Sequence, residues 1–162
     1  MSQPMNPQDT RLNLHPGEWY FGMEYLSLYT LLGSCVALSV WHPRLKLGGL
    51  CHYLLPTAPE QRLQQDLRAG HAGRYAVTVL ALLKQRMLSY AAISEYQIGL
   101  FGGSDSDSNF TIGNQNIVYA QQWLAAQNIN LKVCDVGGNK SRTLILNVLS
   151  GELNVKSYSM AR

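Results

Sequence analysis

The sequence is poor in charge and in long apolar runs, and each shortage excludes a class of protein. Only 14% of the 162 residues are charged, and the 13 lysines and arginines are scattered without a run of like charge. A nucleic-acid-binding protein needs a clustered basic face. The longest apolar stretch with helical spacing, residues 75–83, is far short of the roughly 20 residues that span a bilayer. We therefore expect no nucleic-acid partner and no membrane insertion.

Cysteine is also scarce, and the N-terminus has no apolar segment of the kind that a signal peptide contains. The three cysteines, Cys35, Cys51 and Cys134, form neither a CxxC pair nor a disulfide framework. No group of histidines and cysteines has the spacing of a zinc site. We expect a cytoplasmic protein with no metal and no organic cofactor, in which each thiol is either a small buried hydrophobe or a nucleophile.

Strand signals and helix signals follow one another along the chain and predict an α+β fold. Residues 1–13 are interpreted as a flexible N-terminal leader and residues 14–162 as a single domain. Apolar and aromatic runs predict strands near residues 19–21, 25–29, 36–41, 50–55, 96–101, 131–136, 142–148 and 153–158.

Apolar residues recur at intervals of three and four in two segments, which predicts two main helices at residues 74–90 and 113–127. The polar residues 57–73 between strand and helix indicate a loop or a loose helix. Groups of strands with two intervening helices are typical of a layered α/β sandwich of mixed β-sheets.

Cys35 follows a glycine at the point where one predicted strand ends and the next begins. Gly33 permits a tight turn. Such a turn through Gly33 and Ser34 can direct unpaired backbone N–H groups toward the sulfur, where they favour a thiolate and can later stabilise an oxyanion. Free cysteine is also among the most buried residue types, so a core cysteine is the competing interpretation.

His52 lies in an otherwise apolar strand, where an imidazole needs a hydrogen-bond partner. If this strand pairs with the strand that follows Cys35, the thiol and the imidazole come within reach of each other. Alternation along the strand directs Cys51 to the opposite face. The alternative is a core histidine with a purely structural hydrogen bond. The other histidines lie in turns or loops and are expected to be solvated: His15, His42 and His71.

Several segments, in order along nearly the whole chain, resemble the CheD family of chemoreceptor glutamine deamidases. The two most specific are 30–37 (TLLGSCVA) and 48–56 (GGLCHYLLP), which contain Cys35 and His52. The others are His15-Pro16-Gly17-Glu18, Phe101-Gly102-Gly103, Ile112-Gly113-Asn114-Gln115-Asn116, Asp135-Val136-Gly137-Gly138-Asn139 with Arg142, and Gly151-Glu152-Leu153. Many relatives carry lysine in place of Gly99 and arginine in place of Gln115, which bears on receptor choice more than on chemistry.

The resemblance implies a fold like that of the toxin-type cysteine deamidases, with papain-like chemistry. Cys35 would attack the carboxamide of a receptor glutamine, and His52 would move the proton from the thiol to the departing ammonia. Water would then hydrolyse the thioester to glutamate. Thr30 matches the hydroxyl that orients the histidine, and Ser34 is close enough to compete for that role.

The resemblance also implies partners, namely the cytoplasmic domains of chemoreceptors and a CheC-type phosphatase. Two other functions stay open beside deamidation. One is hydrolysis of receptor glutamate methyl esters, and the other is a non-catalytic role as the binding partner of that phosphatase.

Overall fold

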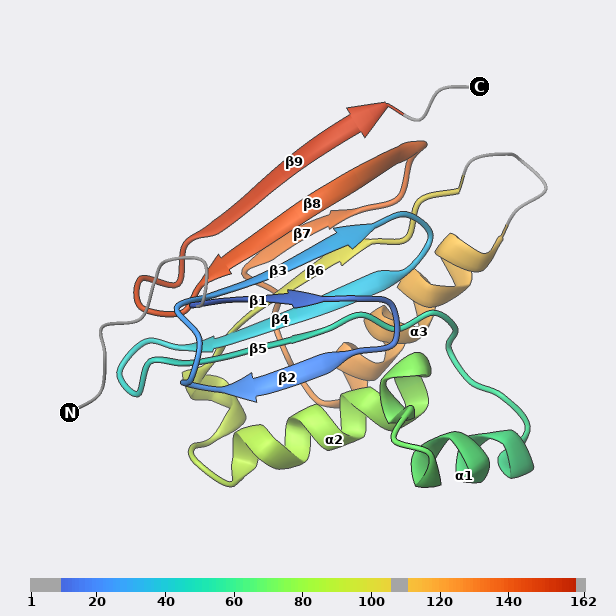
Figure 1. Cartoon of the computed structure of the whole chain (residues 1–162), viewed down its shortest axis with the longest axis horizontal. Coiled ribbons are helices and arrows are strands. Elements are labelled where there is room, and N and C mark those ends of the chain that lie inside the picture. The colour runs from blue at the N-terminus through green and yellow to red at the C-terminus, as the bar shows by residue number, and fades with distance from the viewer. Residues whose placement is uncertain (1–9, 106–110, 160–162) are drawn as a thin grey trace.

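The computed structural model describes residues 10–105 and 111–159, which form two β-sheets and three α-helices (Figure 1). The first sheet has the order β1-β3-β8-β9, with strands Arg11–Leu14, Ser27–Leu32, Lys140–Asn147 and Leu153–Ser159. The second has the order β2-β5-β4-β6-β7, with strands Trp19–Gly22, Leu47–Cys51, Val36–His42, Gln97–Gly102 and Val133–Val136. Both sheets are mixed, because β1 with β3 and β6 with β7 are parallel whereas the other pairs are antiparallel.

The two sheets and the helices stack as three layers. One apolar cluster fills the space between the sheets, with Leu28 and Leu144 from the first and Leu50 and Phe101 from the second. A second cluster joins the other face of the second sheet to α2 (Ala76–Leu88) and α3 (Ile112–Ala126). Because β4 is covered on both faces, every one of its residues is buried, which explains its continuous apolar run.

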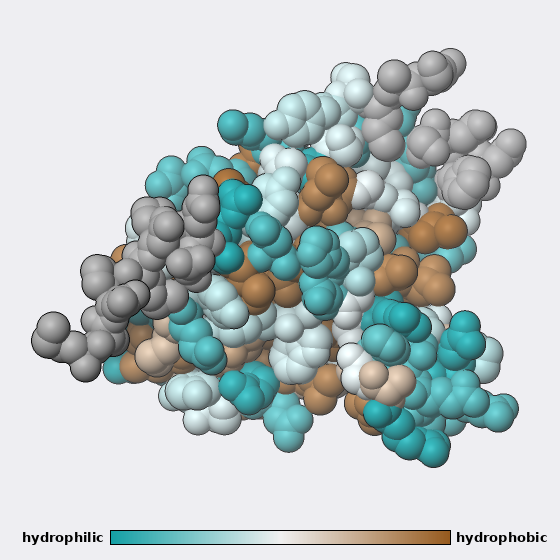
Figure 2. All heavy atoms as spheres, in the orientation of Figure 1, coloured by the Kyte–Doolittle hydropathy of each residue, from teal (hydrophilic) through white to brown (hydrophobic). Residues whose placement is uncertain are grey.

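The predicted sandwich and its two main helices are confirmed, but the structure has a third helix. Helix α1 (Glu60–Arg68) occupies the polar segment that the sequence analysis assigned to a loop or a loose helix. The surface over α1 is strongly hydrophilic (Figure 2), and Asp66 is its one buried residue. The helix contains only two apolar residues, Leu63 and Leu67, which are too few to define a buried helical face from the sequence. None of the described helices is long and apolar enough to cross a membrane.

The boundary predicted for the N-terminal leader differs from the structure. Strand β1 begins at Arg11 and pairs in parallel with β3, placing Leu14 opposite Thr30. Leu14 is buried between the sheets, so the ordered chain begins before residue 14. The leader's residues 1–9 lie outside the described residues.

Candidate functional site

The loop Gly33–Cys35 connects β3 to β4 across the two sheets, and the carbonyl of each of its residues is hydrogen-bonded. The donors are Ser104 N to Gly33 O (3.0 Å), Asn116 Nδ2 to Ser34 O (3.1 Å) and Gly103 N to Cys35 O (2.9 Å). No described residue accepts a hydrogen bond from the N–H of Ser34 or Cys35. The loop is therefore held through its carbonyls while these two N–H groups stay available.

The Phe101-Gly102-Gly103 motif supports this loop by close backbone approach. Gly102 has a φ of +101°, and a Cβ atom there would lie 2.3 Å from the carbonyl oxygen of Cys35. Gly113, at the start of α3, is packed against the same segment, since its Cβ would lie 2.4 Å from Gly103 O. A side chain at these positions would push the Cys35 loop away.

A buried arginine fixes the same region from the first sheet. Arg142, in β8, is fully buried and donates to Gly102 O (3.4 Å), Ser104 Oγ (2.9 Å) and Gly137 O (2.7 Å). Its Nε also pairs with Asp135 Oδ1 at 3.2 Å. A planar guanidinium with several donors can satisfy such a set of carbonyls at once.

Strand pairing places Cys35 and His52 on adjacent segments, as the sequence analysis expected. Strands β4 and β5 are antiparallel, and their register continues to a bridge between Val36 and Tyr53. Cys35 and His52 are therefore diagonal neighbours across this pair, a relation in which Cα atoms lie about 7–8 Å apart and side chains can meet. Cys35 packs against the inter-sheet cluster, and His52 is buried.

His52 is held by a hydroxyl from the opposite sheet. Thr30 Oγ1 lies 2.7 Å from His52 Nδ1 and 2.8 Å from Leu14 O. A hydroxyl has one hydrogen to donate, and a carbonyl can only accept. The Thr30 hydroxyl therefore donates its hydrogen bond to Leu14 O. Thr30 Oγ1 must then accept from His52 Nδ1–H. The neutral imidazole consequently presents Nε2 as an unprotonated acceptor.

The backbone of His52 is fixed by the turn at residues 15–18. Gly17 N donates to His52 O (2.8 Å), and His52 N donates to Glu18 O (3.1 Å). The turn forms one wall of a cleft of about 490 Å³, with His71 and Arg74 on the other side. The cleft is connected to His52 through this turn, whose Gly17 and Glu18 line the cleft and bond the His52 backbone.

Burial sets the protonation of both groups toward neutrality. Desolvation, with a smaller contribution from nearby His15, lowers the pKa of His52 to about 4. Burial also raises the pKa of the Cys35 thiol above its ordinary value. Backbone N–H groups were expected to favour a thiolate at Cys35, whereas burial favours a neutral thiol and a neutral imidazole. Such a pair needs the imidazole as a general base during attack.

The side chains of Ser34 and Cys51 are not partners of His52 Nδ1. The Ser34 side chain is exposed, and the Nδ1 partner of His52 is Thr30. Cys51 belongs to the helix-side core, where burial raises its pKa to about 12. The alternation argument for Cys51 is thus confirmed.

One histidine expectation is wrong. His42 was expected to be solvated, but it is buried at the end of β4. Its Nδ1 accepts from Leu45 N (3.0 Å), and its Nε2 lies 2.9 Å from Glu95 Oε1. Both ring nitrogens have partners, one in the turn after β4 and one in the 3-10 helix Ile93–Glu95, so the imidazole needs no solvent.

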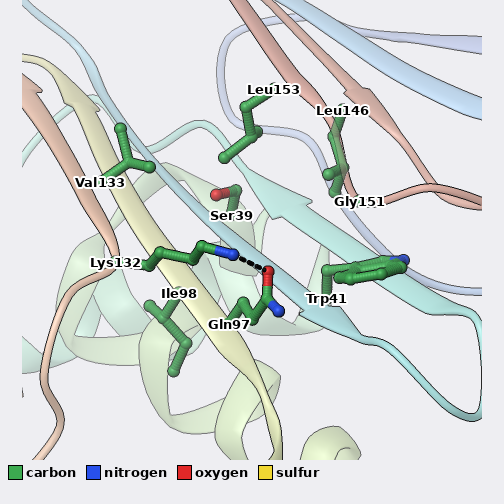
Figure 3. A pocket seen from close by; sticks show the side chains of 9 residues that line it. All are labelled: Ser39, Trp41, Gln97, Ile98, Lys132, Val133, Leu146, Gly151 and Leu153. Atoms are coloured by element: carbon green, nitrogen blue, oxygen red, sulfur yellow. Dashed lines mark hydrogen bonds between the residues drawn. The ribbon is translucent and has the colours of Figure 1, made fainter.

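A second cavity lies toward the other end of β4 (Figure 3). It has a volume of about 250 Å³ and is lined by Trp41, Ile98 and Leu153, with Lys132 Nζ donating to Gln97 Oε1 at 2.8 Å. Along the extended strand β4, Trp41 lies roughly 20 Å from Cys35, so this cavity is remote from Cys35. Among the described residues, no group of three or more histidines, cysteines and carboxylates gathers as metal ligands do.

Comparison with known proteins identifies the family. The family model described as CheD chemotactic sensory transduction matches residues 54–157, which begin just after His52. The chain is 33% identical to probable chemoreceptor glutamine deamidase CheD 1 of Chromobacterium violaceum over 99% of this chain and 84% of the relative. It is 36% identical to probable chemoreceptor glutamine deamidase CheD 3 of Dechloromonas aromatica, over 86% of this chain and 83% of the relative.

A third relative is the probable chemoreceptor glutamine deamidase CheD of Pseudomonas syringae pv. tomato. It is 32% identical over 88% of this chain and 86% of the relative. The first comparison spans the segments that carry Thr30, Cys35 and His52 as well as the region that the family model matches. The chain belongs to the CheD family.

Proposed function

We propose that this protein is a cysteine-dependent protein-glutamine deamidase that converts chemoreceptor glutamines to glutamates during chemotactic adaptation. The observation that carries the proposal is the hydrogen bond from His52 Nδ1 to Thr30, because it leaves Nε2 free to take the proton of Cys35. The printed names of the relatives support the choice of a receptor glutamine as the substrate.

The first half-reaction acylates the enzyme. Cys35 Sγ forms a bond to the carboxamide carbon of the glutamine while its proton moves to His52 Nε2. The tetrahedral oxyanion accepts hydrogen bonds from the backbone N–H groups of the Gly33–Cys35 loop. The carbon–nitrogen bond then breaks, and the proton on His52 goes to the leaving nitrogen, which departs as ammonia.

The second half-reaction regenerates the thiol. Water gives a proton to His52 Nε2 and attacks the thioester carbon. The carbon–sulfur bond breaks, Cys35 Sγ recovers its proton, and the product side chain leaves as a glutamate. During both steps the imidazolium donates through Nδ1–H to the Thr30 hydroxyl oxygen, while the Thr30 O–H keeps donating to Leu14 O.

We assign the protein to the cytoplasm, where the cytoplasmic domains of chemoreceptors are accessible, and relate its layered fold to the toxin-type cysteine deamidases. Binding to a CheC-type phosphatase stays a prediction from the family resemblance. The cleft beside the 15–18 turn adjoins His52 and is a suitable place for residues of the substrate that flank the glutamine.

The nucleophile is tested with purified protein and cytoplasmic fragments of several receptors. Deamidation adds about 1 Da at the modified glutamine and releases ammonia, both measurable by mass spectrometry and an ammonia assay. Cys35→Ala should lose more than about a thousandfold in rate while keeping its thermal unfolding midpoint. Cys134→Ala, which removes an exposed thiol, is the matched control and should be fully active.

Two results would reject this assignment. A fully active Cys35→Ala protein would exclude Cys35 as the nucleophile. Release of methanol from methylated receptors, with no mass gain at any glutamine, would favour the methylesterase alternative over deamidation.

Thr30→Val should lower kcat by about 100-fold, the usual scale of a general base that is no longer correctly oriented. Valine has nearly the shape of threonine but gives His52 Nδ1 no acceptor. Thr30→Ser keeps the hydroxyl and should retain most of the activity. The measurement is the time course of glutamine conversion by mass spectrometry, and equal rates for the valine and wild-type proteins would contradict the role of Thr30.

His52 should make stability depend on pH in a defined window. Its pKa in the folded protein is about 4, below its ordinary value of 6.5, so protonation favours the unfolded chain. The stability it contributes is complete above pH 6.5 and is lost as the pH falls toward 4, by up to about 3 kcal/mol. Urea unfolding at several pH values should show that the free energy of unfolding falls more steeply between pH 6.5 and 4 for the wild type than for His52→Gln. Equal slopes for the two proteins would contradict the lowered pKa of His52.

A further inference from the structure

Asn116 occupies an unusual position, because it is a fully buried amide in the apolar face that α3 presents to the second sheet. Its neighbours on that face are Gly113, Ile117, Ala120 and Leu124. Its Nδ2 donates to Ser34 O at 3.1 Å and to Leu54 O at 2.9 Å. Ser34 precedes Cys35 by one residue, and Leu54 follows His52 by two. One side-chain amide thus joins the segment of the nucleophile to the segment of the base.

The other end of the same amide has no partner. Asn116 Oδ1 is the one buried side-chain polar atom, among the residues that the structure describes, without a hydrogen bond. An unpaired buried acceptor is costly, and such groups in native structures call for an explanation. Turning the amide around would place its oxygen against two carbonyl oxygens. The orientation is therefore dictated by the two bonds that Nδ2 makes.

The helix around Asn116 is docked by other contacts, so the amide is not needed merely to hold α3. Tyr53 Oη donates to the backbone carbonyl of Asn116 at 2.6 Å. Asp105 accepts from the N–H groups of Gly113 and Asn114 at the first turn of α3. What the Asn116 amide adds is the direct connection between the two segments that carry the reacting groups.

We propose that Asn116 is a positioning residue for the deamidation reaction, which fixes the Cys35 loop relative to the His52 segment through its two Nδ2 hydrogen bonds. The inference rests on the proposed function. Without these bonds the loop can shift relative to the imidazole, and small misplacements of reacting groups cost up to about 100-fold in rate. Since Asn116 Oδ1 and Nδ2 are buried, the substrate does not bind to them, so kcat should fall and KM should not change.

The test compares Asn116→Ala with two matched variants. Tyr53→Phe removes one of the other hydrogen bonds that dock α3 and leaves the amide in place. Asn114→Ala removes an exposed amide from the same helix. We expect kcat on a receptor fragment to fall about 10- to 100-fold for Asn116→Ala, with KM within twofold of wild type. Both controls should keep kcat within about threefold after comparison at equal unfolding stability.

A second readout needs no receptor. Alkylation of Cys35 by iodoacetamide depends on proton removal from the thiol, so its second-order rate near neutral pH should fall in Asn116→Ala as kcat does. If wild-type protein deamidates no receptor but this alkylation difference is found, the proposed function fails while the positioning role stands. If deamidation is normal and both rates in Asn116→Ala match Tyr53→Phe, Asn116 is merely structural and the inference is overturned.

Asn116→Asp provides a pH signature and replaces the alanine variant if that protein does not fold. An ionised carboxylate cannot donate to Ser34 O or Leu54 O, whereas a protonated one can donate a single hydrogen bond. Burial favours the protonated form. The kcat of Asn116→Asp relative to wild type should therefore rise as the pH falls from 8 to about 5. A ratio that is constant over this range would contradict the positioning role.

Discussion

The proton of the Thr30 hydroxyl has one acceptor, the carbonyl of Leu14, and this constraint determines the chemistry of the site. Because that hydrogen is donated to Leu14 O, Thr30 Oγ1 can only accept from His52 Nδ1–H, which leaves His52 Nε2 as an unprotonated acceptor. Thr30 and Leu14 belong to the first sheet, whereas His52 follows β5 of the second. The tautomer that the proposed mechanism requires of His52 is therefore fixed only when the two sheets are packed against each other. The hydrogen bond between Thr30 and His52 therefore forms only as the two sheets pack during folding.

The loop that carries Cys35, the proposed nucleophile, depends on a different set of contacts. The Cys35 loop is held through its carbonyls by donors from the end of β6 and from α3. Glycines at the contact points allow the backbones to meet, and Arg142 fixes the segment that supplies the donors. With the carbonyls engaged on one side, the N–H groups of Ser34 and Cys35 are free to stabilise an oxyanion. The same hydrogen bonds to the carbonyls hold the loop and leave the N–H groups available for the proposed catalysis.

Much of this arrangement could be predicted from the chain, since it is encoded locally. The apolar run of β4 and the alternation at Cys51 and His52 gave the correct pairing and the correct face. The leader boundary was wrong because β1 is only Arg11–Leu14, and its stability comes from pairing with β3, which is distant in sequence. Helix α1 was doubtful because its polar sequence has little apolar surface to bury.

The contacts between segments distant in sequence were beyond local reasoning. Nothing in the sequence indicates that Leu14 O will meet Thr30, because the contact arises from the pairing of β1 with β3. Asn116 did carry a signal, namely an amide within the apolar stripe of a helix, where a buried polar group must find partners. Its partners, Ser34 and Leu54, become apparent only when α3 is placed over the second sheet.

The proposed mechanism requires an unprotonated His52 Nε2, and nitrogen-15 NMR of the imidazoles measures this protonation directly. The chain has four histidines, so the His52 signals are assigned by their loss in His52→Gln. At neutral pH we predict a neutral ring with the proton on Nδ1 and an unprotonated Nε2. A ring protonated on Nε2 alone, or an imidazolium at pH 7, would contradict the central claim that Thr30 prepares His52 to accept the proton of Cys35.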